Sequence, residues 1–116
     1  MAQLTLREVC QKYGVSRRAV QGYEACGLVR ATGKTERGYL LYDGKAQEKI
    51  AQIKKYQDFG FRVREIGTLL DAGPEQAKEM LNGKLVLLKE KRRQLGKLIA
   101  ELERMIGDRQ DGDGRA

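Results

Sequence analysis

In the N-terminal half of the chain, short patterns of apolar and polar positions are separated by turn residues. The rest of the chain has one long stretch in which apolar positions recur with a regular spacing. Near the N-terminus, Thr5 and Glu8 have the spacing of a capping box. Leu4 and Val9 can close a hydrophobic staple around that box. Gly14 can take the left-handed conformation that a sharp turn needs. The pattern therefore predicts a first short helix that starts after Thr5 and ends before Gly14.

A second short helix is predicted directly after this turn. Ser16 has a favourable N-cap side chain, and Val15 and Val20 can form its hydrophobic staple. The helix is expected to end near Gly27. Two short helices joined by a turn of three or four residues that contains Gly form a helix-turn-helix. Cys10 lies where such helices cross, so we expect it to be a small buried apolar residue rather than a reactive thiol.

Residues 30–42 have the pattern of a β-hairpin. They contain Gly33 and Gly38, and they end in an alternating run of two Tyr and two Leu at residues 39–42. The tip, residues 34–37, is basic. A hairpin directly after a helix-turn-helix is a wing, and the alternative interpretation is a plain connecting loop.

Two further helices are predicted between the hairpin and Pro74. Asp43 can cap a third helix that extends to about Phe59 and is ended by Gly60. A fourth short helix begins at Phe61. The apolar faces of the two helices comprise Ala46, Ile50, Ile53 and Gln57 in the third and Ile66, Leu69 and Leu70 in the fourth.

The last predicted helix has the clearest periodicity in the chain. It starts at Pro74, a residue that suits a first helical position. The spacing of its stripe alternates between four and three residues, and only Arg92 is not apolar. The stripe consists of Leu81, Leu85, Leu88, Arg92, Leu95, Ile99, Leu102 and Ile106.

Such a heptad stripe is typical of a coiled coil. From Glu75 to Ile106 the helix would be about 48 Å long. A domain of about 70 residues cannot cover that length, so we expect the stripe to pack on a second chain. Arg92 can fix the register of the pair or extend to solvent. The alternative is a helix that folds back on its own domain.

Composition argues against an enzyme. The chain has 116 residues, 6% aromatic residues, no Trp and no His. It offers no pairing of a nucleophile with a base and no phosphate-binding glycine loop, so we expect no catalysis and no cofactor. The two Cys lack the spacing of a zinc site. We find no membrane-spanning run and no signal peptide, and we expect a protein of the cytoplasm.

Positive charge is concentrated in the N-terminal half. Residues 1–70 contain 13 Lys and Arg against 7 Asp and Glu, whereas residues 71–116 contain 10 against 9. A basic half of this kind is the electrostatic footprint of a module that binds nucleic acid. The alternative is a solvated basic surface.

Taken together, the motifs between Leu4 and Leu70 resemble the MerR family of bacterial transcription regulators. No single motif decides this, but their order and spacing do. They are Gly14–Ser16, Arg18, Tyr23–Glu24, Gly27–Leu28, Gly38–Tyr39, Leu41–Tyr42, Gly60–Phe61 and Glu65–Ile66.

The resemblance implies a mainly α fold with a winged helix-turn-helix head, a small β-hairpin wing and a long antiparallel coiled-coil dimerisation helix. We place the head at residues 1–72, the dimerisation helix at residues 73–107 and a disordered tail at residues 108–116. The implied partners are double-stranded DNA, a second copy of the chain and RNA polymerase at a promoter. The implied activity is regulation of transcription by a homodimer on near-palindromic promoter DNA, in the nucleoid.

The resemblance also suggests which residues bind DNA. Arg18, Tyr23 and Tyr39 match family positions that contact DNA. The segment around Gly60 would form a second wing. From their chemistry alone, we add residues suited to phosphates or base edges. These are Ser16, Arg17, Gln21, Lys34, Arg37, Lys54, Lys55 and Arg62.

Three positions depart from the family pattern. Gln21 and Gly22 stand where an Arg and an aromatic residue are usual, and Leu40 stands where an Arg is usual. The loss of two guanidinium groups should reduce the salt dependence of DNA binding. Gln21 can instead donate to and accept from an adenine edge. Gly22 costs a recognition helix about 1 kcal/mol relative to Ala.

Two alternatives to a promoter-binding regulator remain at this point. One is an architectural or accessory DNA-binding protein, such as an excisionase-like or nucleoid factor. The other is a coiled-coil adaptor whose DNA binding is vestigial. Residues 107–116 contain neither Cys nor His, so the sequence offers no metal sensor after the last helix.

Overall fold

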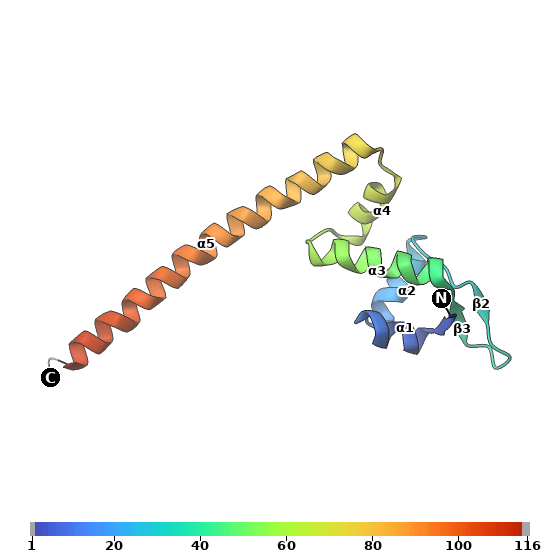
Figure 1. Cartoon of the computed structure of the whole chain (residues 1–116), viewed down its shortest axis with the longest axis horizontal. Coiled ribbons are helices and arrows are strands. Elements are labelled where there is room, and N and C mark those ends of the chain that lie inside the picture. Colours follow the sequence, from blue (N-terminus) through green and yellow to red (C-terminus); the bar gives the residue numbers. More distant parts are fainter. Residues whose placement is uncertain (1, 115–116) are drawn as a thin grey trace. The chain divides into compact units, whose positions relative to one another are not determined.

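The computed structural model describes residues 2–114 of the chain and the side chains of residues 2–109. It divides into two compact units, residues 1–77 and residues 78–116, and each is described by itself. The first unit holds a small sheet and helices α1 to α4, and the second consists of most of helix α5 (Figure 1).

The first two helices have the predicted caps. Helix α1, Leu6–Tyr13, is preceded by Thr5, whose hydroxyl accepts from the amide of Glu8, while the Glu8 carboxylate accepts from the amide of Thr5 at 2.9 Å. The helix ends at Gly14, which has φ +66°. Because the Glu8 carboxylate accepts the Thr5 backbone and side-chain hydrogen bonds, its pKa is lowered. Helix α2, Arg17–Ala25, confirms the predicted helix-turn-helix.

A three-stranded antiparallel sheet contains the predicted hairpin and one strand that the sequence did not reveal. Strands β2, Gly33–Lys34, and β3, Leu40–Tyr42, form the wing. Strand β1, Leu4–Thr5, pairs with the other side of β3, which gives the order β1-β3-β2. Two residues are too short a run for a strand pattern, so only the pairing identifies β1. The wing is thereby joined directly to the start of α1.

Helices α3 and α4 pack against each other, and α3 also packs on α1 and β3. Helix α3, Gly44–Asp58, begins after Asp43, whose carboxylate accepts from the amide of Ala46 at 2.9 Å. Helix α4 spans Val63–Asp71 and does not have the predicted start at Phe61. Phe61 is buried in the connection before the helix, because its ring packs edge-to-face on Tyr56.

The core of the first unit is formed by apolar residues from every helix and from β3. The fully buried apolar residues are Val9, Val20, Tyr42, Ile50, Ile53 and Ile66. Gln47 is buried among them and is saturated with hydrogen bonds. Its amide donates to the carbonyls of Ala2 and Tyr42, and its side-chain oxygen accepts from the hydroxyl of Tyr13 at 3.0 Å. These bonds tie the N-terminus and the wing strand to α3.

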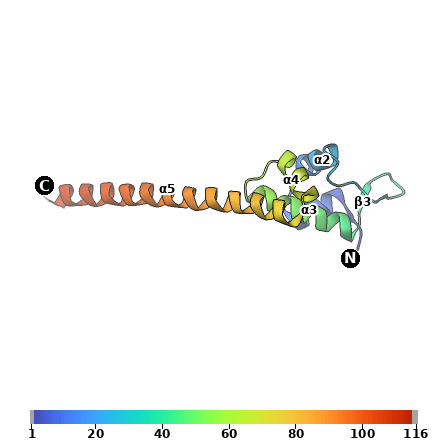
Figure 2. The same ribbon diagram turned by 90° about the horizontal axis from the view of Figure 1, so that it is seen from above.

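Helix α5 spans Pro74–Gly114 and begins at the predicted proline (Figure 2). It continues beyond the predicted end at residue 107. The expectation of disorder from residue 108 is therefore wrong for the backbone of residues 108–114, while residues 115 and 116 lie outside the described residues. Glycine lowers helix propensity by only about 1 kcal/mol per residue, and no proline stops the helix there. Within the described residues, no helix is long and apolar enough to cross a membrane.

Candidate nucleic-acid interface

Helix α2 has one buried face and one exposed face that carries polar side chains. Val20 lies on the buried face, whereas Arg17, Arg18 and Gln21 are exposed. The hydroxyl of Ser16 accepts from the amide of Ala19 at 3.0 Å and so caps the helix. Two guanidinium groups and one amide are therefore presented over the first turns of a rigid helix. This is the arrangement that base and phosphate contacts in a major groove need.

Tyr23 has a different place from the one the family resemblance suggested. Its side chain is only 1% exposed, and its hydroxyl donates to the side-chain oxygen of Gln57 on α3 at 2.5 Å. Burial is the main reason why the pKa of Tyr23 is raised. The DNA contact of Tyr23 stays a prediction, and in this structure the buried ring fixes α2 on α3. Its position three residues after Val20 places it on the buried helix face, a signal that the sequence already contained.

A second tyrosine fixes the wing on α2. Tyr42 of strand β3 is fully buried, and its hydroxyl donates a short hydrogen bond to the carboxylate of Glu24. Burial, and then this hydrogen bond, raises the pKa of Tyr42. The hydroxyl is therefore a neutral donor at physiological pH. Together with the bond between Tyr23 and Gln57, it holds the recognition helix, the wing and α3 in one arrangement.

The tip of the wing is closed by hydrogen bonds rather than being a loose loop. The amide of Thr35 donates to the carbonyl of Tyr39 at 2.8 Å, and the amide of Gly38 donates back to Thr35 at 2.9 Å. Gly38 has φ +87°, a conformation that favours glycine. Lys34 and Arg37 are exposed at this tip, and Tyr39 is 63% exposed. An exposed tyrosine on a hydrogen-bonded turn is placed for contact with another molecule.

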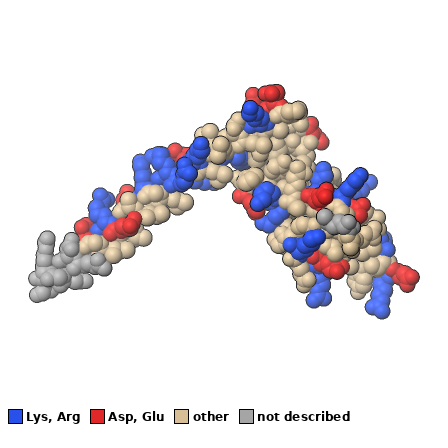
Figure 3. Space-filling model, in the orientation of Figure 1, with Lys and Arg blue, Asp and Glu red and all other residues tan. Residues whose placement is uncertain are grey.

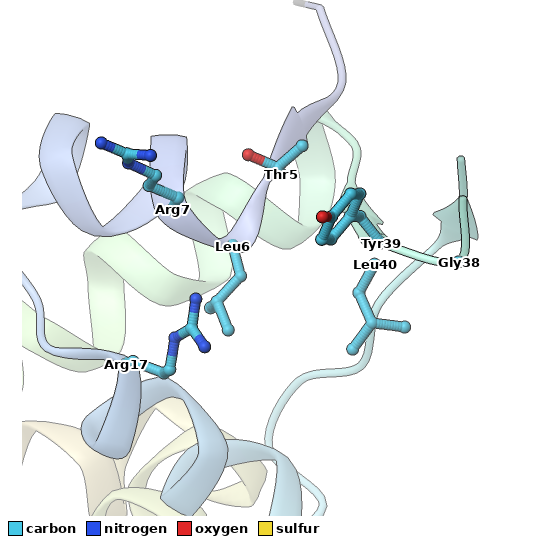
Figure 4. A pocket seen from close by; sticks show the side chains of 7 residues that line it. All are labelled: Thr5, Leu6, Arg7, Arg17, Gly38, Tyr39 and Leu40. Carbon is cyan, nitrogen blue, oxygen red and sulfur yellow. The ribbon is translucent and has the colours of Figure 1, made fainter. Parts of the chain in front are cut away.

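A cleft of about 510 Å³ lies between the wing and the starts of α1 and α2. Figure 4 shows the Arg17 side chain extending beside Leu6, with Tyr39 and Leu40 on the wing side of the cleft. The lining residues are Thr5, Leu6, Arg7, Arg17, Gly38, Tyr39 and Leu40. The sequence did not identify Arg7 as a candidate, because only the pairing of β1 with β3 brings the start of α1 beside the wing.

The remaining predicted residues lie on α3 and at the start of α4. The ammonium of Lys54 forms an ion pair with Asp58 at 2.6 Å, and this bond raises the pKa of Lys54. Lys55 and Arg62 are exposed. The backbone amide of Arg62 donates to the carboxylate of Glu65 at 2.9 Å, which fixes the proposed second wing at the start of α4. Lys54 is thus already paired with a carboxylate, whereas Lys55 and Arg62 present their charges to solvent.

Lys and Arg side chains project from the first unit on the face seen in Figure 3, with fewer acidic groups between them. This distribution agrees with the excess of Lys and Arg over residues 1–70, 13 against 7 Asp and Glu.

The two cysteines are free, Cys26 exposed and Cys10 partly exposed. The expectation of a buried Cys10 is therefore wrong, because its neighbour Val9 occupies the core position. Among the described residues, no cluster of His, Cys, Asp and Glu could hold a metal.

The winged helix-turn-helix and its exposed basic helix define a class, the transcription regulators that bind DNA. Two family models specify it further. The model described as MerR HTH family regulatory protein matches residues 4–73, and the model described as MerR, DNA binding, matches residues 47–108. The chain belongs to the MerR family, as the sequence motifs predicted.

Characterised relatives agree with this assignment. The chain is similar to the mercuric resistance operon regulatory protein of Bacillus cereus, with 29% identity over 104 residues, or 87% of this chain and 78% of that protein. It is also 28% identical to the HTH-type transcriptional activator mta of Bacillus subtilis over 101 residues, which are 87% of this chain but only 39% of that protein. The match to mta is thus confined to less than half of the activator.

Solved structures share the fold. The N-terminal part of the Bacillus subtilis multidrug transporter activator, MtaN, has a TM-score of 0.66 at 27% identity and covers 89% of this chain and 97% of its own. A MerR family regulator from Bacillus cereus has a TM-score of 0.74 at 20% identity, with coverage of 90% and 80%. HiNmlR, a MerR family regulator lacking the sensor domain and bound to promoter DNA, has a TM-score of 0.51 at 19% identity, with coverage of 90% and 79%. The last two support the fold alone.

Proposed function

We propose that this MerR-family transcription regulator acts as a homodimer that binds near-palindromic promoter DNA in double-stranded form. The observation that carries the proposal is the cleft between α2 and the wing. It combines the guanidinium of Arg17, the exposed Tyr39 and the apolar side chains of Leu6 and Leu40. A cationic group beside aliphatic walls suits a sugar–phosphate backbone, which is charged at the phosphate and apolar along the deoxyribose.

In this proposal the exposed face of α2 reads bases and the wing binds the flanking backbone. Arg18 has the geometry to donate to guanine, and Gln21 can both donate to and accept from adenine. The wing tip adds phosphate contacts that position the protein without reading sequence. The residues proposed for the backbone are Ser16, Arg17, Lys34, Arg37, Tyr39, Lys55 and Arg62, with Arg7 added by the structure.

Homodimerisation is supported by the exposed stripe of α5. Its seven apolar side chains are each at least 39% exposed in the single chain, which is an unusually large apolar surface to leave in water. A dimer would place two recognition helices on two half-sites, and a near-palindromic target follows from that symmetry. RNA polymerase at the promoter is the further partner proposed, and the nucleoid in the cytoplasm is the proposed location. The proposal includes no catalytic reaction.

The test is selection of bound duplexes from a random DNA pool, followed by affinity measurement on the selected sequence. We expect an inverted repeat, and affinity at least about a thousandfold above that for scrambled duplex. Arg18→Ala and Gln21→Ala should each relax the sequence preference at one position of each half-site. Lys97→Ala, which removes a charge on α5 outside the stripe, is the matched control and should leave the preference unchanged.

Equal affinity for every duplex, measured with a folded dimer, would instead favour an architectural DNA-binding protein. An adaptor would bind no duplex with appreciable affinity. The selection experiment therefore separates all three functions.

A further inference from the structure

A shallow depression lies at the base of the wing, away from its tip. It is lined by the connection between α2 and β2 and by the first turns of α3, and its volume is about 260 Å³. We call it the basal depression. Its lining residues are Leu28, Val29, Arg30, Thr32, Asp43, Lys45, Ala46 and Lys49. None of them lines the cleft between α2 and the wing, so the two sites are separate.

Hydrogen bonds hold the two sides of the basal depression together. The amide of Asp43 donates to the hydroxyl of Thr32 at 2.7 Å, and the amide of Thr32 donates to the carbonyl of Leu41 at 2.8 Å. The amide of Leu28 donates to the carbonyl of Tyr23 at 2.9 Å, which ties the connection to the end of α2. The depression is therefore preformed, and a partner would not have to order it on binding.

Three cations line the depression, and none of them is neutralised among the described residues. Arg30 and Lys45 are exposed, and Lys49 is partly exposed. The ion pairs found among residues 2–109 involve other lysine and arginine residues. Lys45 and Lys49 are also four residues apart on α3, a spacing at which like charges destabilise a helix. An acidic partner would relieve this repulsion.

Apolar side chains form the floor beneath these cations. Val29 is 8% exposed and Ala46 is 6% exposed, whereas Leu28 keeps part of its surface open to solvent. An apolar centre with a polar and charged rim is the usual composition of a contact between two proteins. Leu28 is the apolar side chain that a partner would meet first.

We propose that the basal depression binds an acidic peptide segment of a partner protein, one in which aliphatic side chains lie between Asp or Glu residues. Carboxylates of that segment would bind to Arg30, Lys45 and Lys49, and an aliphatic side chain would pack on Leu28. The inference goes beyond the proposed function, because it adds a protein partner and a second surface outside the residues proposed to bind DNA.

Asp43 favours a peptide over a DNA backbone as the occupant. Its carboxylate lies in the depression and accepts from the amide of Ala46 at 2.9 Å. A carboxylate can accept from several donors, so it is available to a further N–H group. A peptide offers backbone N–H donors beside its carboxylates, whereas the phosphates and deoxyriboses of a duplex backbone offer only acceptors. A line of phosphates would therefore face an unmatched carboxylate.

Binding of a labelled peptide to the full chain tests this inference. The probe is a short fluorescein-labelled peptide made of Asp-Glu-Leu repeats, and fluorescence anisotropy follows its binding. The double variant Lys45→Ala/Lys49→Ala, the depression variant, should bind the probe about three- to thirtyfold more weakly, which is the loss expected for two solvent-exposed charge pairs. A peptide of Asn-Gln-Leu repeats should bind more weakly than the probe because it lacks the carboxylates. A peptide of Asp-Glu-Ser repeats should also bind more weakly, because it has no aliphatic side chain for Leu28.

Two matched variants separate the basal depression from positive charge in general. Lys97→Ala/Arg104→Ala removes the same net charge from exposed positions of α5 outside the stripe, and it should leave probe binding unchanged. Lys34→Ala/Arg37→Ala at the wing tip should weaken binding to the selected duplex but not to the probe. The depression variant should have the reverse effect, with duplex affinity close to the native value.

Charge reversal provides a positive test. Lys45→Glu/Lys49→Glu should lose affinity for the acidic probe and gain affinity for a peptide made of Lys-Arg-Leu repeats. Thermal unfolding checks that each variant is folded. If the depression variant does not fold, Arg30→Ala replaces it, because Arg30 lies outside any helix or strand.

Three outcomes would overturn the inference. The first is probe binding that the depression variant leaves unchanged in a folded chain. The second is the absence of any difference between the acidic and the neutral peptide. The third is a depression variant that weakens duplex binding as much as probe binding, which would assign the depression to the DNA surface. In each case the duplex measurement tests the proposed function separately, because sequence-specific binding by α2 would still stand.

Discussion

The first unit and helix α5 use the same apolar residues in opposite ways. Ile50 and Ile53 of the first unit are completely buried, whereas Leu95 and Leu102 of α5 are both 59% exposed. The difference lies in how often the sequence interrupts its helices. Caps and left-handed glycines end each of α1, α2 and α3 within fifteen residues, so their apolar faces can turn toward each other. Helix α5 runs for 41 residues without such an interruption.

Turn residues therefore decide where a core forms. Where caps and left-handed glycines interrupt the helices, the core is completed within one copy. Where they do not, the apolar stripe stays exposed in the single chain, and we propose that a second copy covers it. Stability of the first unit and assembly through α5 should therefore respond to separate substitutions.

The largest effect is expected from a charge placed in the stripe. Leu95→Lys should convert the dimer into a monomer in light scattering. Affinity for an inverted-repeat duplex should then fall by roughly a hundred- to ten-thousandfold, because the second half-site contact is no longer intramolecular. The thermal unfolding of the first unit should stay the same.

Val86→Lys is the control for this substitution, since Val86 is 66% exposed on α5 but lies outside the stripe. The dimer and its DNA affinity should persist in that variant. A dimer that survives Leu95→Lys would show that the stripe is not the assembly surface.

A cavity in the core of the first unit should lower the stability of that unit and leave assembly through α5 unchanged. Ile53→Ala removes a completely buried side chain, and we expect it to lower the free energy of unfolding of that unit by about 2–5 kcal/mol. Chemical denaturation followed by tyrosine fluorescence measures this loss. Dimerisation through α5 should be retained at temperatures where the variant is folded. If Ile53→Ala reduced dimerisation as much as it reduced folding, the stability of the first unit and assembly through α5 would not be independent.

Substitutions in the cleft beside the wing should have smaller effects than those in the stripe of α5 or in the core of the first unit. Arg17→Ala should weaken DNA binding about five- to fiftyfold and reduce the slope of log affinity against log salt by about 0.9. Fluorescence anisotropy at several salt concentrations gives both values. Leu40→Arg adds a guanidinium to the same cleft, and in the Arg17→Ala background it should restore much of the slope. An unchanged slope in Arg17→Ala would remove Arg17 from the phosphate contacts.

The smallest expected effect is that of salt, which should strengthen dimerisation through α5 and weaken DNA binding by the first unit. Residues 89–94, at the middle of the stripe, contain four Lys and Arg against one Glu, and the antiparallel pairing that the family resemblance implies would bring these segments of both chains together. Screening of that repulsion should tighten the dimer a few-fold between about 0.05 and 0.5 M salt, while DNA binding weakens. Analytical ultracentrifugation without DNA measures the first trend. A dimer that dissociates more readily at high salt would show that these basic segments do not lie together.

Much of the fold was predictable because its signals are local. The capping box at Thr5 and Glu8, the cap at Ser16 and the start of α5 at Pro74 all depend on neighbouring residues. The strand β1 and the cleft residue Arg7 were not predicted, because both depend on a contact between segments more than thirty residues apart. Pairing of so short a strand leaves no periodic trace in the sequence.

The candidate interface was predictable where exposure follows from helix periodicity. Arg18 and Gln21 lie on the exposed face of α2, in agreement with their position relative to Val20. Tyr23 was selected from the family resemblance, although that same periodicity places its ring on the buried face of α2. Its hydroxyl bond to Gln57 could not be inferred from sequence, because Gln57 is thirty-four residues away on another helix. Contact of each exposed residue with DNA stays a prediction.

The pairing of β1 with β3 has a consequence for how this protein can diversify. The wing is anchored at its base by the strand that leads into α1, while its tip between Lys34 and Leu40 is closed only by its own hydrogen bonds. Insertions or deletions at the tip would alter how far the wing reaches without changing the direction in which it leaves the sheet. Evolution, or a protein engineer, can thus retune the affinity for the flanking DNA backbone by exchanging a few tip residues on an unchanged scaffold.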